Sequence, residues 1–126
     1  EMKTSELIGP ALDWVVAKCE GVNEETFRLF YEPTEPTDYD AHGFPEFNYS
    51  TIWPQAGPII ERECIATYAS GACSVSPKNP DYWVAEILDT EEMITQYGPT
   101  PLIAAMRCYC ASKFGDEVEI PSELQP

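Results

Sequence analysis

The sequence predicts an α+β fold in which a small antiparallel β-sheet packs against two main α-helices, the first and the last of the chain. Residues 9–21 and 100–115 carry apolar side chains at helical spacing, each between a proline near the start and a glycine at the end. Residues 64–69 and 82–88 have the composition of strands, and residues 71–80 supply a turn between them. The length of 126 residues and the hydrophobic content of 44% suit a single domain, residues 1–126, with one core.

The first helix is predicted over residues 9–21. Pro10 follows Gly9 at its start, where the missing N–H of a proline costs no hydrogen bond, and Gly21 ends the pattern. The apolar positions recur at intervals of three and four residues, which places them on one face of a helix. They are Leu12, Val15, Val16 and Cys19. We therefore expect this face to pack against the core.

The next segments predict a strand and then a long loop. Residues 26–32 have strand composition. Residues 33–58 hold five of the twelve prolines, and eight of the fifteen aromatic residues lie between Phe27 and Trp53. Because plain linkers are poor in aromatic residues, we expect an ordered, Pro/aromatic-rich loop that covers the core or lines a pocket.

The middle of the chain predicts a short helix and a pair of strands. Gly57-Pro58 repeats the helix-opening pattern, so a helix is expected over residues 59–63. Residues 64–69 then look extended, and we expect them to pair with residues 82–88 across the turn.

The last helix has a strong start signal and a strong stop signal. Thr100 is placed to cap it, Pro101 occupies the first helical position, and Gly115 follows its end. The apolar positions between them again fall on one face: Leu102, Ala105, Met106 and Tyr109. Residues 116–126 form an acidic C-terminal tail that we expect on the surface.

The charge of the chain excludes two classes of partner. Seven Lys and Arg residues against 22 Asp and Glu residues give a formal net charge of −15 at pH 7. Duplex nucleic acid and an anionic membrane surface both require a basic footprint, so neither is an expected partner. No apolar run reaches the length of a membrane span and no signal-peptide pattern opens the sequence, so we expect a cytoplasmic protein.

The cysteines and the lone histidine predict neither a metal site nor a cofactor. The five cysteines include no C-x-x-C pair, and Cys108 and Cys110 point to different faces of a helix. His42 follows Asp38 and Asp40 at alternating positions, a pattern that we interpret as a solvated acidic loop. No catalytic motif is present, so an enzyme, such as a hydrolase using carboxylates or His42, is a lesser alternative to a non-enzymatic role.

Four blocks of the sequence resemble the NinX family of tailed bacteriophages and prophages. They are residues 3–21, 49–63, 98–124 and the strand around Trp83. The second block departs from the usual family wording, because Ile52 stands where relatives have an acid. A role that relatives give to that acid is therefore missing here. The resemblance implies a phage accessory protein made inside an infected bacterium, with no agreed enzyme activity.

A polar and aromatic cluster in the second block is the first candidate for a ligand site. Its members are Tyr49, Ser50, Thr51, Trp53 and Gln55. An indole and a phenol beside hydroxyl and amide groups can recognise a base or a sugar by stacking and edge hydrogen bonds. Gly-Pro pairs at three predicted helix starts add backbone N–H groups that suit an anion, and one of these starts also has a capping residue, Thr100.

Two arginines are the second candidate. Arg62 and Arg107 belong to the few positive residues of the chain, and both lie in the family-like blocks. One interpretation is that they form salt bridges that fix the fold. The other is that their planar guanidinium groups face a pocket and bind an anionic ligand.

The sequence favours binding over catalysis. The first hypothesis is a counter-defence protein that sequesters a small anionic, nucleotide-like ligand. The alternative is an acidic inhibitor that imitates the charge of DNA and blocks a host defence protein or nucleic-acid enzyme. A homo-oligomer is compatible with either hypothesis.

Overall fold

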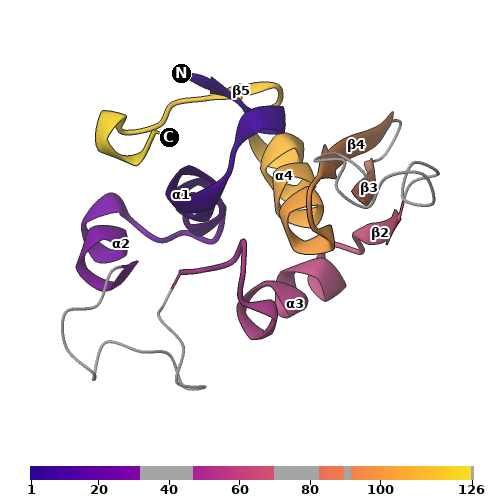
Figure 1. The fold of residues 1–126 in the computed structure, drawn as a ribbon, viewed down its shortest axis with the longest axis horizontal. Coiled ribbons are helices and arrows are strands. Elements are labelled where there is room, and N and C mark those ends of the chain that lie inside the picture. Colours follow the sequence, from indigo (N-terminus) through magenta and orange to yellow (C-terminus); the bar gives the residue numbers. More distant parts are fainter. Residues whose placement is uncertain (32–46, 70–82, 90–91, 126) are drawn as a thin grey trace.

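The computed structural model describes residues 1–31, 47–69, 83–89 and 92–125. Figure 1 shows the fold as a ribbon coloured along the sequence from the N-terminus to the C-terminus. The elements are β1 (Met2–Lys3), η1 (Thr4–Glu6), α1 (Gly9–Cys19), α2 (Glu24–Tyr31), α3 (Trp53–Arg62), β2 (Ala66–Ala69), β3 (Trp83–Asp89), β4 (Glu92–Gly98), α4 (Pro101–Phe114), β5 (Glu117–Val118) and η3 (Ser122–Leu124). The predicted turn at residues 71–80 and most of the predicted loop, including His42, lie outside the described residues.

The α+β prediction is confirmed. Strands β2, β3 and β4 form an antiparallel sheet in that order, and Val84 of β3 pairs with Tyr68 on one side and Tyr97 on the other. Helix α4 packs on this sheet, and α1 packs on α4. In Figure 1, α4 accordingly lies between α1 and the sheet. Strand β4 is an element that the sequence analysis did not identify.

Helix α4 is the centre of the core, and its predicted ends are confirmed. The Thr100 hydroxyl accepts a hydrogen bond from the Ile103 N–H at 3.1 Å, and Gly115 follows the last turn with a φ of 78°. Every residue from Leu102 to Ala111 is buried. A helix that is buried on all sides needs covering elements on all sides, and the sheet, α1 and α3 provide them. In the described part of the chain, no helix has the length and apolar character needed to cross a membrane.

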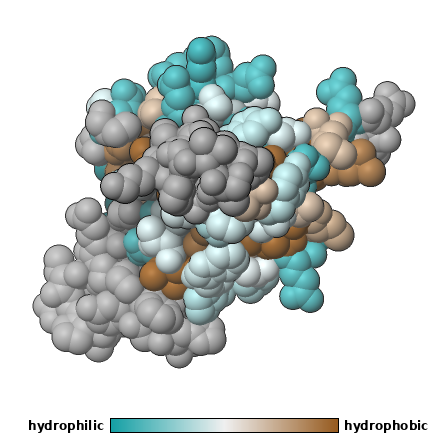
Figure 2. Space-filling view, turned by 45° about the vertical axis from the view of Figure 1, so that its right-hand side comes forward, coloured by the Kyte–Doolittle hydropathy of each residue, from teal (hydrophilic) through white to brown (hydrophobic). Residues whose placement is uncertain are grey.

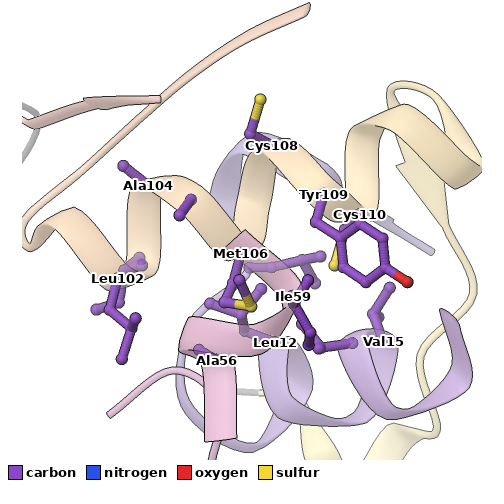
Figure 3. Close-up of a cluster of buried hydrophobic side chains, with 14 of the residues drawn as sticks. Leu12, Val15, Ala56, Ile59, Leu102, Ala104, Met106, Cys108, Tyr109 and Cys110 are labelled. Atoms are coloured by element: carbon purple, nitrogen blue, oxygen red, sulfur yellow. The ribbon is translucent and has the colours of Figure 1, made fainter. Parts of the chain in front are cut away.

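Three helices supply the side chains of the main core. Leu12 and Val15 of α1, Ile59 of α3 and Met106 of α4 are all buried and belong to one hydrophobic cluster. Figure 3 shows these side chains directed toward one another from the three helices. The predicted apolar face of the first helix is therefore the face that packs in the core.

The predicted strand at residues 26–32 is wrong, because residues 24–31 form helix α2. The Asn23 side chain accepts a hydrogen bond from the Thr26 N–H at 2.8 Å, which is an N-cap interaction. Glu24 and Arg28 form an ion pair one turn apart at 2.6 Å. Phe27 packs on Trp14, with ring centroids 5.3 Å apart. These local interactions outweigh the aromatic composition that suggested a strand.

Helix α3 begins earlier than the sequence predicts. Residues 53–58, assigned above to the end of the Pro/aromatic-rich loop, are helical, and Pro54 rather than Pro58 occupies the first turn. Pro58 lies inside the helix, where its missing N–H removes one backbone hydrogen bond. The apolar side chains of Ala56 and Ile59 are both buried, so packing on the core compensates for this loss.

The two ends of the chain meet. Met2 and Lys3 pair antiparallel with Val118 and Glu117, and this short sheet was not expected from the sequence. The acidic tail does not lie wholly on the surface, because Val118 and Ile120 belong to the hydrophobic core. Their acidic neighbours Glu117 and Glu119 are exposed.

The outer face of the three-stranded sheet carries exposed apolar side chains. They are Tyr68, Leu88, Met93 and Tyr97. Alternate residues of β3, such as Ala85 and Ile87, are buried in the core instead. In the space-filling view of Figure 2, hydrophobic (brown) residues are exposed next to hydrophilic (teal) residues.

Candidate ligand site between helices α3 and α4

A pocket of about 200 Å³ lies where helices α3 and α4 begin. We call it the α3–α4 pocket. It is lined by Ser50, Thr51, Trp53, Thr100, Pro101, Leu102 and Ile103. Four of these residues are predicted site residues, and they come from segments fifty residues apart in the sequence. Figure 3 shows Leu102 projecting from the first turn of α4 on the side where α3 lies.

Both helices present their N-terminal ends to this pocket. Trp53 is the first residue of α3 and Pro101 is the first residue of α4. Arg62, in the last turn of α3, donates a hydrogen bond to Tyr109 of α4, and Lys113, in the last turn of α4, lies 3.5 Å from Glu63, which follows α3. The C-terminal turns of the two helices therefore also lie close together. Their partial positive charges meet at the pocket, and their partial negative charges meet near Arg62.

One wall of the pocket is held by a buried carboxylate. The backbone N–H of Ser50 donates a hydrogen bond to Asp13 Oδ1 at 2.8 Å, and both residues are buried. This bond ties the turn before α3 to α1. The Ser50 hydroxyl has no hydrogen-bond partner among the described residues, although Ser50 is only 3% exposed.

The other wall is the first turn of α4. Thr100 caps the Ile103 N–H through its side chain and the Ala104 N–H through its carbonyl, and Pro101 has no N–H. Within the described residues this leaves the Leu102 N–H without an acceptor. Two residues of the pocket lining, Ser50 and Leu102, therefore each carry a polar group without a partner among the described residues.

Arg107 holds the segment that leads into this wall. Its side chain donates from Nε to the Leu7 carbonyl and from NH1 to the Tyr97 carbonyl, each at 2.8 Å. Next to Tyr97, Gly98 passes so close to α4 that a Cβ there would lie 2.8 Å from Ala104 N. Arg107 is 7% exposed and lies in the interior, outside the pocket lining.

The aromatic members of the predicted cluster have different positions. Trp53 lines the pocket and is 51% exposed. Tyr49 packs against the core beside Phe47, with ring centroids 6.4 Å apart. Gln55 accepts a hydrogen bond from the Asn48 N–H at 2.6 Å. Tyr49 and Gln55 therefore support the turn that carries Ser50, and neither lines the pocket.

Arg62 belongs to a separate group of polar side chains, which we call the Arg62 cluster: Glu20, Arg62, Glu63, Tyr109 and Lys113. Arg62 pairs with Glu20 at 2.6 Å and with Glu63 at 2.9 Å. The Tyr109 hydroxyl donates to Glu20 at 2.5 Å, and Lys113 lies 3.5 Å from Glu63. Of the two interpretations of Arg62, the structure shows the salt bridges.

The Arg62 cluster stabilises the charged form of Glu20. Burial alone would raise the pKa of Glu20, but hydrogen bonds from Arg62 and Tyr109 outweigh it and the pKa is lowered. Burial and the hydrogen bond to Glu20 raise the pKa of Tyr109. Arg62 and Lys113 lie in the last turns of α3 and α4, where cations suit the helix dipole.

The α3–α4 pocket has a different electrostatic character. Its described lining consists of hydroxyls, an indole and apolar side chains, and no Lys, Arg, Asp or Glu is among these described residues. Two helix N-termini contribute a charge of roughly +0.5 each. The side chain of Asp13 lies one hydrogen bond away, behind Ser50. The described lining of the pocket therefore carries no formally charged side chain, in a chain of net charge −15.

The cysteines show no reactive arrangement in the described region. Burial is the main cause that raises the pKa of the Cys108 thiol to about 12, so this thiol stays protonated at neutral pH. Burial and the neighbouring Cys19 also raise the pKa of Cys110. The described residues contain no group of three or more His, Cys, Asp or Glu side chains arranged to hold a metal ion.

Sequence reasoning missed the supporting residues of the pocket. Asp13 interrupts the apolar pattern of the first helix, and a carboxylate among core positions is a signal for a buried hydrogen bond. A side-chain pattern cannot reveal that the Leu102 N–H is unpaired among the described residues. The helix start at Thr100-Pro101 does predict that backbone N–H groups of the first turn have no acceptor within the helix.

Comparison with known proteins identifies one family. The family model described as "Bacteriophage P22, NinX" matches residues 3–113. The match includes every described residue of the α3–α4 pocket and all five residues of the Arg62 cluster. No curated protein matches the chain.

Proposed function

The chain belongs to the bacteriophage P22 NinX family, and from this membership and the α3–α4 pocket we propose that it acts by binding a small nucleotide-like ligand. In this proposal it is a non-enzymatic accessory protein in the cytoplasm of the infected bacterium. It sequesters its ligand and so keeps a nucleotide signal from a host defence system.

The observation that carries the proposal is the Ser50 hydroxyl, which has no hydrogen-bond partner in the part of the chain that the structure describes. A buried polar group without a hydrogen bond costs about 1–3 kcal/mol of folding free energy. Ser50 is 3% exposed, and the pocket that it lines opens beside the half-exposed indole of Trp53. A ligand that bonds to this hydroxyl and stacks on the indole recovers the cost on binding.

The walls of the pocket suit a binding role because they are held before a ligand arrives. Asp13 fixes the Ser50 turn, and Arg107 fixes the strand end that leads to Thr100. Pre-organised walls reduce the entropy that is lost on binding. Among the described residues, the lining also holds no acid or base that would perform proton transfer, which favours sequestration over catalysis.

Calorimetry with a panel of nucleosides, nucleotides and cyclic dinucleotides tests the proposal. We expect one class to bind the wild-type chain, and Trp53→Ala to weaken its binding about tenfold or more. The matched control is Tyr68→Ala, because Tyr68 is an aromatic residue of similar exposure on the far sheet face. No binding across the panel, combined with no ligand carried from the bacterial host in native mass spectrometry, would refute the proposal.

A second candidate function rests on the outer face of the sheet. Leu88 and Met93 are paired neighbours at the end of the β3–β4 hairpin, and both are exposed beside the exposed Glu92. Apolar contact surface next to acidic side chains suits an acidic inhibitor of a host protein. Leu88→Asp should abolish such an interaction in pull-downs, and light scattering of the same variant tests whether the face joins two copies of the chain.

A further inference from the structure

We infer that the group entering the α3–α4 pocket is the uncharged base of a nucleoside or nucleotide, and that any phosphate stays outside. This inference rests on the proposed function and specifies which part of the ligand the pocket recognises. Of the two roles that the sequence analysis gave to different residues, base recognition and anion binding, it keeps the first for this pocket.

The first argument is electrostatic. Neither arginine of the predicted site lines the pocket: Arg62 pairs with Glu20 and Glu63, and Arg107 donates to two backbone carbonyls. The two helix N-termini supply roughly one positive charge in total. Asp13 lies one hydrogen bond behind the Ser50 turn, and its carboxyl group adds no positive charge. A phosphate entering the pocket would lose its hydration without gaining a cation.

The second argument is the set of hydrogen-bonding groups. The Ser50 hydroxyl can both donate and accept, and the Leu102 N–H can donate. A nucleobase presents donors and acceptors side by side along one edge, so it can satisfy both groups together. Ser50 is more than nine-tenths buried and lines the pocket, which makes its hydroxyl a point of recognition rather than a solvated surface group.

The third argument is shape. The indole of Trp53 and the ring of Pro101 lie in the same lining, with Leu102 and Ile103 as apolar neighbours. Flat, apolar surfaces of this kind stack on a base. The volume of about 200 Å³ is below the range of pockets that enclose a whole drug-sized ligand. One ring system therefore enters, and the remainder of the ligand stays in solvent.

Calorimetry on the full chain tests the inference with two sets of probes: the five common nucleosides and their 5′-monophosphates. We expect at least one nucleoside to bind as tightly as its monophosphate or more tightly. We also expect binding of the monophosphate to improve or stay constant when NaCl rises from about 50 mM to about 500 mM, because salt screens repulsion by the acidic chain.

The outcomes separate the inference from the proposed function. If a monophosphate binds about tenfold more tightly than its nucleoside, and salt weakens that binding, the inference is overturned while the proposed function stands. If neither set binds and cyclic dinucleotides do, the inference is again overturned alone. If no nucleotide of any kind binds, both fail.

A pair of serine variants tests the recognition point itself. Ser50→Ala should weaken nucleoside binding about tenfold without lowering the unfolding temperature, because its hydroxyl has no partner to lose among the described residues. The matched control is Ser112→Ala, whose hydroxyl donates to the Tyr109 carbonyl outside the pocket. Equal binding by both variants and the wild type would overturn the role of Ser50. Trp53→Phe, which keeps a ring for stacking, should retain more affinity than Trp53→Ala.

Discussion

Helices α3 and α4 join two polar regions that differ in how fully their groups are paired. At the C-terminal ends, Arg62, Glu20 and Glu63 bond to one another, with Tyr109 and Lys113 completing the cluster. At the N-terminal ends, the Ser50 hydroxyl and the Leu102 N–H have no described partner. The comparison teaches that the charged groups here stabilise the fold, while the uncharged groups remain available for a ligand.

Substitution of Asp13, which supports a wall of the pocket, is expected to change the free energy of unfolding most. Asp13→Ala should lower the free energy of unfolding by about 2–4 kcal/mol, because it leaves the buried Ser50 N–H without an acceptor. Asp13→Asn keeps an acceptor oxygen and should cost less than the alanine variant. Urea unfolding of the three proteins provides the comparison. If Asp13→Ala unfolds at the same urea concentration as the wild type, the pocket wall does not depend on this hydrogen bond.

The next prediction compares two buried hydroxyl groups, that of Thr4, which has a hydrogen-bond partner, and that of Ser50, which has none among the described residues. Thr4 donates from its hydroxyl to the Gly115 carbonyl at 2.9 Å, so Thr4→Val should cost about 1–2 kcal/mol. Ser50→Ala should leave the free energy of unfolding unchanged or slightly higher, since it removes a buried polar atom that has no described partner. Thermal unfolding at one pH measures both. Equal losses in the two variants would remove the distinction between the regions.

The Arg62 cluster should respond weakly to truncation. Arg62 is half exposed, so solvent screens its ion pairs with Glu20 and Glu63. Arg62→Met keeps an apolar side chain of similar length and should cost only about 0.5–1 kcal/mol, less in high salt. Nucleoside binding should not change. Chemical denaturation at low and high ionic strength, with calorimetry on the same samples, checks both statements, and a loss of nucleoside binding would place Arg62 in the site.

The smallest effect concerns pH. The pKa of Glu20 is lower in the folded chain than its ordinary value of 4.5, because the hydrogen bonds from Arg62 and Tyr109 outweigh the opposing effect of burial. Its contribution to stability is therefore complete above pH 4.5 and is lost as pH falls through the lowered folded pKa. Between neutral pH and this acidic range, the wild type should lose slightly more stability than Glu20→Gln. An equal loss of unfolding free energy with falling pH in the two proteins would contradict the lowered pKa of Glu20.

Much of the fold could be predicted from local sequence signals. Thr100, Pro101 and Gly115 mark both ends of α4 through interactions within a few residues, and the structure has those ends. The helix at residues 24–31 was missed because its Asn23 cap was outweighed by aromatic composition. The pairing of Met2 with Val118 joins residues far apart in the chain, and two-residue strands carry no periodic pattern.

The candidate site was only partly accessible to sequence reasoning. Residue chemistry pointed to Ser50, Thr51, Trp53 and Thr100, and the structure brings them together around one pocket. Charge pointed to Arg62 and Arg107, but a sequence does not show which acceptor a guanidinium reaches. Here the acceptors are carboxylates for Arg62 and backbone carbonyls for Arg107. That these residues bind a ligand stays a prediction.

The indole signals of the protein test the central claim most directly. The chain contains three tryptophans, Trp14, Trp53 and Trp83, and Trp53 is the one at the pocket. In a ¹H–¹⁵N NMR titration with the best-binding nucleoside, the account predicts that the Trp53 indole signal shifts most and that the Trp53→Phe variant assigns it. A titration in which the nucleoside binds while the Trp53 signal stays in place would contradict the account.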